Sequence, residues 1–109
     1  MKILIAGSRS IKDFDLSPHI PPGTDLIIAG GASGIDMLAE QYADHNRISK
    51  LILRPHYQLY GKAAPIKRNE IMVDLADYVL VIWDGKSRGS QHTIQYAKKK
   101  EKALVIVKA

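Results

Sequence analysis

The stretch LIIAGGASGID at residues 26–36 decides the fold of this chain. A short apolar run ends in glycines and a serine, and Ile35 and Asp36 then open a segment with helical spacing. Glycine allows unusual backbone angles and carries no Cβ, so N–H groups at the positive end of a helix stay open to an anion. The stretch predicts a buried strand, a phosphate-binding turn and a helix. The alternative is that these are only the glycines of a tight turn.

Four short apolar runs are continuous rather than alternating, which is typical of parallel strands buried on both faces. They occupy residues 2–7, 25–30, 78–83 and 103–108. A fifth run at 50–55 is shorter and ends at Pro55. Helical patterns separate the runs, and this alternation implies a parallel sheet with right-handed crossovers. We expect one α/β domain over residues 1–109, with a small Rossmann-like parallel sheet of about five strands flanked by helices.

The first expected helix covers residues 34–44, with Ser33 as its N-cap because serine accepts a hydrogen bond from a first turn. The second begins at Ala64 or Pro65 and ends at Leu75, with Val73 and Leu75 turned partly inward. The third begins near residue 90. The connection over residues 7–24 is rich in proline, so we expect only a short helix there, around residues 12–16.

Composition excludes several classes of protein. The chain has 109 residues, of which 46% are hydrophobic and 25% charged, and these are values typical of a folded globular domain. It contains no cysteine, which excludes disulfides and thiolate metal sites. The histidines show no ligand spacing for zinc, so we expect neither a metal nor a cofactor. No signal-peptide pattern or membrane-spanning run is present, so we expect a cytoplasmic protein with no membrane partner.

The charge balance favours anionic partners. Sixteen Lys and Arg against eleven Asp and Glu give a formal net charge of +5. Much of this excess lies at Lys98, Lys99, Lys100 and Lys102, where cations complement the dipole at the end of a helix. A nucleic-acid-binding patch is the alternative interpretation of these lysines.

Two further segments end at the same edge of the predicted sheet as the glycine turn. GSR at residues 7–9 follows the first run, and its arginine is suited to clamping an anion. WDGKSRGS at residues 83–90 follows the fourth run and forms a second turn suited to phosphate. Trp83 either stacks on a base or packs in the core. The glycine turn at residues 30–34 matches neither the Walker nor the G-x-G-x-x-G pattern, which argues against a P-loop ATPase and a conventional NAD dehydrogenase.

The adjacent Arg68 and Asn69 lie early in the second expected helix. Judged from the residues alone, they belong to a solvated helix face. His92 has two interpretations, a general acid or base near neutral pH and an exposed histidine in a first helical turn.

Taken together, GSR, GGASGID, YGKAAPIKRNEIM, LADYVLVIWDGKSRGS and the final ALVIV resemble the small single-domain members of the SLOG superfamily, and most closely the YspA-like or DUF2493 family. The resemblance covers nearly the whole chain. It implies a Rossmann-like sheet whose carboxyl edge binds a nucleotide or nucleotide-derived ligand. The site residues that it implies are Gly7, Ser8, Arg9, Gly30, Gly31, Ala32, Ser33, Gly34, Asp36, Arg68, Asn69, Trp83, Gly85, Ser87, Gly89 and Ser90.

The chain departs from its relatives in two places. Ser90 stands where threonine is usual in the family. The lonely-guy phosphoribohydrolases of the superfamily carry PGGxGTxxE, and their glutamate serves catalysis, whereas Thr93 stands at that place here with His92 beside it. The catalytic carboxylate is therefore missing, and Asp36 and Asp84 are the candidates to replace it.

Three functions follow as hypotheses. The first is binding of a nucleotide or a nucleotide-derived ligand, such as a molecule of the ADP-ribose type, as a sensor. The second is an N-glycosidase or phosphoribohydrolase acting on a nucleotide. The third is a single-stranded-DNA-binding module like DprA, with steep salt dependence. We also expect a symmetric homodimer, because superfamily relatives are commonly oligomers.

Overall fold

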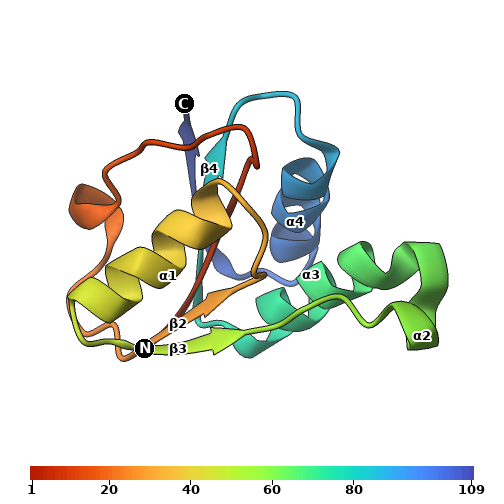
Figure 1. Ribbon diagram of the computed structural model, residues 1–109, viewed down its shortest axis with the longest axis horizontal. Helices are drawn as coiled ribbons and strands as arrows, with labels where there is room; N and C mark the ends of the chain where they lie inside the picture. Colours follow the sequence, from red (N-terminus) through yellow and green to blue (C-terminus); the bar gives the residue numbers. More distant parts are fainter.

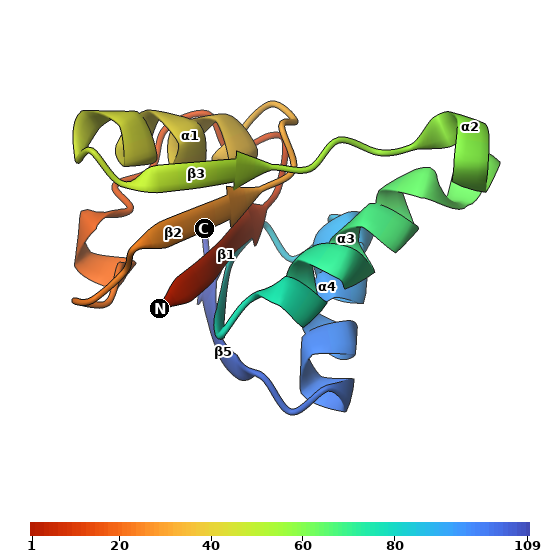
Figure 2. The same cartoon turned by 90° about the horizontal axis from the view of Figure 1, so that it is seen from below.

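The computed structural model describes residues 1–109 and contains one five-stranded parallel sheet (Figures 1 and 2). Its strand order is β3-β2-β1-β4-β5, and every neighbouring pair is parallel. The strands are β1 (Lys2–Gly7), β2 (Leu26–Ala29), β3 (Ser49–Ile52), β4 (Tyr78–Trp83) and β5 (Ala103–Lys108). The predicted α/β class with a small Rossmann-like parallel sheet is confirmed.

Helices cover the two faces of the sheet separately. Figure 2 shows α1 on one face and the pair α3 and α4 on the other, while α2 projects beyond the end of β3. None of these helices is both long and apolar enough to cross a bilayer. The α-helices are α1 (Ile35–His45), α2 (Tyr57–Tyr60), α3 (Ala64–Leu75) and α4 (Arg88–Lys99), and short 3-10 turns are η1 (Ser17–His19) and η2 (Gly61–Ala63).

A hydrophobic core lies on each face, because successive side chains of a strand point to opposite sides. In β1, Ile3 and Ile5 belong to the core under α1, and Leu4 and Ala6 belong to the core under α3 and α4. This explains the continuous apolar runs of the central strands β1, β2 and β4.

The edge strand β5 differs from the expectation of burial on both faces. Its side chains are half-buried or exposed, and Val105 and Ile106 are among the exposed large apolar residues. β5 pairs only with β4, and α1 packs on β1, β2 and β3 instead. The edge position therefore decides its exposure, which an apolar run alone does not reveal.

The observed helices differ from the predicted ones in several details. Gly34, with φ of 74°, occupies the N-cap of α1, and Ser33 makes no capping bond. α4 begins at Arg88, two residues before the expected start, because Ser87 caps it. α3 has the expected bounds, but Leu75 is exposed.

The connection before β2 also differs from the prediction. Residues 12–16 are not helical, and the only helical turn there is η1. Asp15 accepts the backbone N–H of Ser17, and Pro18 stands in the first turn, where its missing N–H is not needed.

The strand order places a topological switch point between β1 and β4. The chain moves outward from β1 to β2 and β3 on one side, and from β4 to β5 on the other. In open α/β sheets the loops at such a point diverge and leave a crevice at the carboxyl ends of the strands.

Candidate functional site

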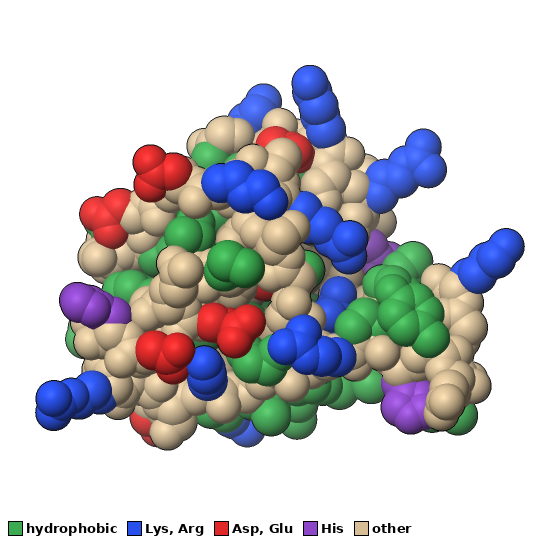
Figure 3. All heavy atoms as spheres, viewed as in Figure 1, with side chains coloured by type: hydrophobic (Ala, Val, Ile, Leu, Met, Phe, Trp, Pro, Cys, Tyr) green, Lys and Arg blue, Asp and Glu red, His purple; other side chains and the backbone are tan.

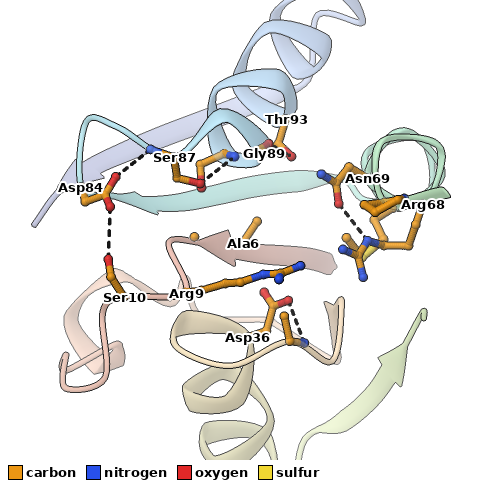
Figure 4. Close-up of a pocket in the computed structure, with 15 residues that line it drawn as sticks. Ala6, Arg9, Ser10, Asp36, Arg68, Asn69, Asp84, Ser87, Gly89 and Thr93 are labelled. Carbon is orange, nitrogen blue, oxygen red and sulfur yellow. Dashed lines mark hydrogen bonds between the residues drawn. The ribbon is translucent and has the colours of Figure 1, made fainter. Parts of the chain in front are cut away.

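A polar cavity of about 350 Å³ occupies that switch point (Figure 4). Only 3 of its 15 lining residues are hydrophobic. The lining comes from the end of β1 and its loop, the glycine turn, α3, and the first turns of α4. It consists of Ala6, Gly7, Arg9, Ser10, Ala32, Asp36, Pro65, Arg68, Asn69, Met72, Asp84, Ser87, Gly89, Ser90 and Thr93. We call this space the main cavity.

The structure brings most of the expected site residues together. The expected residues that line the main cavity are Gly7, Arg9, Ala32, Asp36, Arg68, Asn69, Ser87, Gly89 and Ser90. Those that do not line it are Ser8, Gly30, Gly31, Ser33, Gly34, Trp83 and Gly85. Of the second group, Gly30, Gly31 and Ser33 line a smaller hollow on the other side of the glycine turn.

Some backbone N–H groups of the glycine turn already have hydrogen-bond acceptors within the protein. The backbone N–H of Ala32 donates to Asp36 Oδ2 at 3.2 Å, and that of Ile35 donates to the Ser8 carbonyl at 3.4 Å. A Cβ on Gly30 would lie 2.6 Å from Arg68 Nη1, and one on Gly34 would lie 2.5 Å from the Ser8 carbonyl oxygen. These glycines thus make room for an arginine and for the loop after β1, rather than for the approach of an anion.

Asp36 presents a carboxylate to the main cavity from the first turn of α1. Its side chain is only 8% exposed, and Oδ1 has no hydrogen-bond partner in the protein. Burial raises the pKa of this carboxyl group, against the opposing effects of the Ala32 N–H and of the charges on Arg68 and Arg9. In Figure 4 the Arg9 side chain extends across the cavity beside Asp36. Asp36 is therefore the free acceptor of the cavity.

Arg68 is buried in α3, contrary to the interpretation as a solvated face. Its Nη1 donates to the carbonyl oxygens of Gly30 at 2.7 Å and Leu53 at 3.1 Å, and its Nε donates to Asn69 Oδ1 at 2.8 Å. No carboxylate pairs with it within ion-pair distance. Burial lowers its pKa, although a guanidinium stays protonated in proteins. The result is a fixed cation whose Nη2 has no acceptor.

The first turn of α4 supplies backbone donors to the main cavity. The N–H groups of Arg88 and Gly89 have no acceptor in the protein, whereas Ser90 N–H donates to Ser87 Oγ at 3.4 Å. A Cβ on Gly89 would meet nothing nearer than Asn69 Nδ2, at 3.9 Å. The cavity therefore reaches the backbone at Gly89, and the expected second turn for phosphate has open donors.

Asp84 and Ser8 hold the two loops of the switch point together. Asp84 Oδ1 accepts the N–H groups of Lys86 at 2.8 Å and Ser87 at 2.9 Å, and Oδ2 accepts Ser10 Oγ at 3.1 Å. These contacts lower the pKa of Asp84 to about 2, and the hydrogen bonds from the backbone N–H groups of Lys86 and Ser87 have the largest effect. Ser8 Oγ accepts the Asp84 N–H and is 1% exposed. Both residues therefore help to fix the shape of the site.

Two expected site residues, Trp83 and Gly85, lie elsewhere, and so does His92, whose role the sequence left open. Trp83 packs against the core under α3 and α4 and donates from Nε1 to the Ser87 carbonyl at 3.0 Å, which is the core-packing alternative. Gly85, with φ of 83°, lies against the Lys108 side chain. His92 faces Glu70 with a separation of 3.0 Å between Nε2 and Oε2, away from the cavity lining.

Several side chains that line the main cavity were not among the expected site residues. Ser10 directly follows the GSR motif, and Thr93 lies four residues after Gly89 on the same helix face. The sequence spacing that placed the GSR motif and Gly89 at the site could therefore have predicted both residues. Pro65 and Met72 lie three residues before and four after Arg68, on one side of α3.

The fold and the main cavity define a small α/β domain of Rossmann-like order, with a polar, arginine-containing cavity at its switch point. No protein-family model matches the chain, and neither a curated protein nor a solved structure matches it.

Proposed function

We propose that the protein binds a nucleotide or a nucleotide-derived ligand in the main cavity and acts as a sensor of it. The observation that carries this proposal is the division of the cavity into two chemical ends. Donors without partners gather between α3 and α4, and one free carboxylate oxygen lies near α1. A phosphate ester of a sugar needs both kinds of partner.

The donor end suits a phosphate group. The free N–H groups of Arg88 and Gly89 lie at the positive end of the α4 dipole. Asn69 Nδ2, which has no acceptor in the protein, and the guanidinium of Arg68 belong to the same cavity. Arg68 is already buried and oriented, so an anion offsets its unpaired charge at little cost in side-chain ordering.

The acceptor end suits sugar hydroxyl groups. Asp36 Oδ1 is free, and an ionised carboxylate only accepts hydrogen bonds, so it requires a donor such as a hydroxyl. An acidic residue commonly meets the ribose in Rossmann-type sites. The resemblance to the SLOG superfamily agrees with such a ligand and remains a prediction.

The first experiment is a thermal-shift and calorimetric screen of nucleoside monophosphates, ADP-ribose and the matching uncharged nucleosides. We expect stabilisation that depends on the phosphate. Gly89→Leu fills the open space at the α4 N-terminus and should abolish binding. Gln91→Leu, which places the same leucine side chain on the exposed face of the same helix, should preserve it. A wild-type protein that responds to none of the phosphorylated compounds would refute the proposal.

Asp36 supports a second candidate function, cleavage of an N-glycosidic bond in a nucleotide. A carboxylate beside the sugar stabilises the oxocarbenium-like transition state of such cleavage. Asp36 is buried in the cavity with a free oxygen and a raised pKa, whereas the oxygens of Asp84 hold its loop. Chromatography should detect free base released by the wild type but not by Asp36→Asn. The DNA-binding alternative lacks comparable support, because no aromatic side chain lines the main cavity.

A further inference from the structure

A second, smaller space of about 230 Å³ lies on the other side of the glycine turn from the main cavity. We call it the arginine hollow, because Arg9, Arg54 and Arg68 line it, together with Tyr57 and the turn itself. It shares the side chains of Arg9 and Arg68 with the main cavity. On the face shown in Figure 3, Lys and Arg side chains gather between the parts that hold α1 and α2.

The charge of the arginine hollow is unbalanced. Three guanidinium groups line it, and no carboxylate does. None of these arginines takes part in an ion pair of the protein. Burial lowers the pKa of Arg68, the charge of Asp36 raises it, and the charge of Arg9 lowers it to a smaller extent, as expected for repulsion between two neighbouring cations. In the free protein these cations oppose each other, and an entering anion relieves that repulsion.

The arginines are held in place by the backbone of the turn. Arg54 Nη1 donates to the Gly31 carbonyl at 3.1 Å, and Arg68 Nη1 donates to the Gly30 carbonyl at 2.7 Å. A Cβ on Gly31 would collide with the Arg54 guanidinium. Successive carbonyl groups thus anchor two neighbouring guanidinium groups, while Nη2 of Arg68 and the Nε and Nη2 groups of Arg54 make no hydrogen bond within the protein. Such a fixed pair of forks matches the oxygens of a phosphate.

Tyr57 and Pro55 complete the wall of the hollow. Pro55 follows Arg54 directly and restricts its backbone to extended conformations. Tyr57 is 59% exposed, and its hydroxyl makes no hydrogen bond within the protein. The phenol therefore adds one neutral donor to the arginines.

We propose that the arginine hollow binds a second phosphate group of the same ligand, a terminal phosphate monoester, so that the ligand is a nucleotide with two separate phosphates. A monoester carries up to two negative charges near neutral pH, while a diester carries one, and the three arginines favour the larger charge. Because Arg9 and Arg68 line both spaces, the main cavity and the hollow are adjacent, and we expect one ligand to reach both. This inference rests on the proposed function.

The test compares adenosine 5′-monophosphate with adenosine 3′,5′-bisphosphate by calorimetry. We expect the bisphosphate to bind at least tenfold more tightly to the wild type. In Arg54→Gln that advantage should fall to near parity while binding of the monophosphate persists, because Arg54 does not line the main cavity. Lys62→Gln makes the same charge change at an exposed position outside both spaces and should keep the advantage.

A second measurement tests whether the arginine hollow binds an anion, and it uses no nucleotide. Gly89→Leu closes the phosphate end of the main cavity and serves as the background. Phosphorus NMR line broadening of pyrophosphate should report binding to Gly89→Leu and to Gly89→Leu with Lys62→Gln, but not to Gly89→Leu with Arg54→Gln. Arg54 is exposed, so Arg54→Gln should fold, and circular dichroism checks this.

The outcomes separate the two proposals. A monophosphate that binds and a bisphosphate that gains nothing refute the hollow and leave the main cavity standing. Pyrophosphate bound through Arg54, with no nucleotide bound, supports the hollow as an anion site and refutes the proposed function. Binding of no probe refutes both.

Discussion

Arg68 Nη1 donates to the carbonyl oxygen of Gly30 at 2.7 Å, so a buried guanidinium of α3 is locked to the turn after β2. A Cβ on Gly30 would lie 2.6 Å from that nitrogen, closer than atoms can approach. Arg68 thus leaves no room for a side chain at Gly30, where a Cβ would also lie 2.9 Å from Asp36 Oδ2. Arg68 lines both the main cavity and the arginine hollow. The glycine turn thus holds the side chain of Arg68, which lies 38 residues further along the chain.

The first prediction concerns this contact. Gly30→Ala should lower the free energy of unfolding by about 1–3 kcal/mol, because the added methyl group overpacks a buried site. Urea denaturation measures this loss. In an Arg68→Met background the same alanine should cost at least about 0.5 kcal/mol less, which a double-mutant cycle resolves. Equal losses in both backgrounds would show that the crowding at Gly30 has another source.

Much of the fold was predictable because it depends on local patterns. Continuous apolar runs marked β1, β4 and β5 with their observed bounds, and helical spacing located α1 and α3. Exposure was not predictable in the same way, since Val105 in the edge strand and Val79 in a central strand occur in equally apolar runs. The position of a strand in the sheet depends on pairings between distant segments.

The candidate site divides in a similar way. The turns after β1, β2 and β4 were visible as glycine and serine motifs, and parallel strands bring such turns to one edge. Arg68 was different, because from the residues alone it belongs to a polar helix face. Its burial depends on carbonyl acceptors 15 and 38 residues away, which no local pattern records. The role of Arg54 likewise depends on the turn at Gly31.

The second prediction uses the buried carboxyl group of Asp36. Its pKa is raised in the folded protein, so the folded state holds the proton more tightly than the unfolded state. The stability from this group is present below its unfolded pKa and is lost as the pH rises through its folded pKa. Asp36→Asn should therefore unfold no more easily than the wild type at pH 7, and its stability relative to the wild type should fall as the pH is lowered toward about 4 and stay constant below that. Urea denaturation of both proteins between pH 3 and pH 7 tests this.

A matched control keeps that comparison specific. Asp13→Asn removes an exposed carboxylate and should not reproduce the trend. A large loss of stability in Asp36→Asn at pH 7 would contradict the pKa shift and would indicate that the ionised carboxylate holds the turn.

The third prediction concerns the N-cap of α4. Ser87→Ala should lower the free energy of unfolding by about 0.5–2 kcal/mol, because the Ser90 N–H loses its acceptor. Ser87→Thr retains a hydroxyl acceptor and should recover most of the loss. Thermal and urea denaturation of the two variants should rank them in that order. The same stability for alanine and threonine would show that the 3.4 Å contact does not stabilise the helix.

The fourth prediction has the opposite pH dependence to that of Asp36. The pKa of Asp84 is lowered to about 2 by the N–H groups of Lys86 and Ser87, so the folded state favours the ionised carboxylate. Its stabilising effect is present above the unfolded pKa of about 4 and is lost as the pH falls through the folded pKa. The difference in unfolding free energy between the wild type and Asp84→Asn should therefore be largest near neutral pH and should vanish near pH 2. Denaturation along a pH series measures it, and a constant difference over that range would mean that Asp84 acts through its shape and not through its charge.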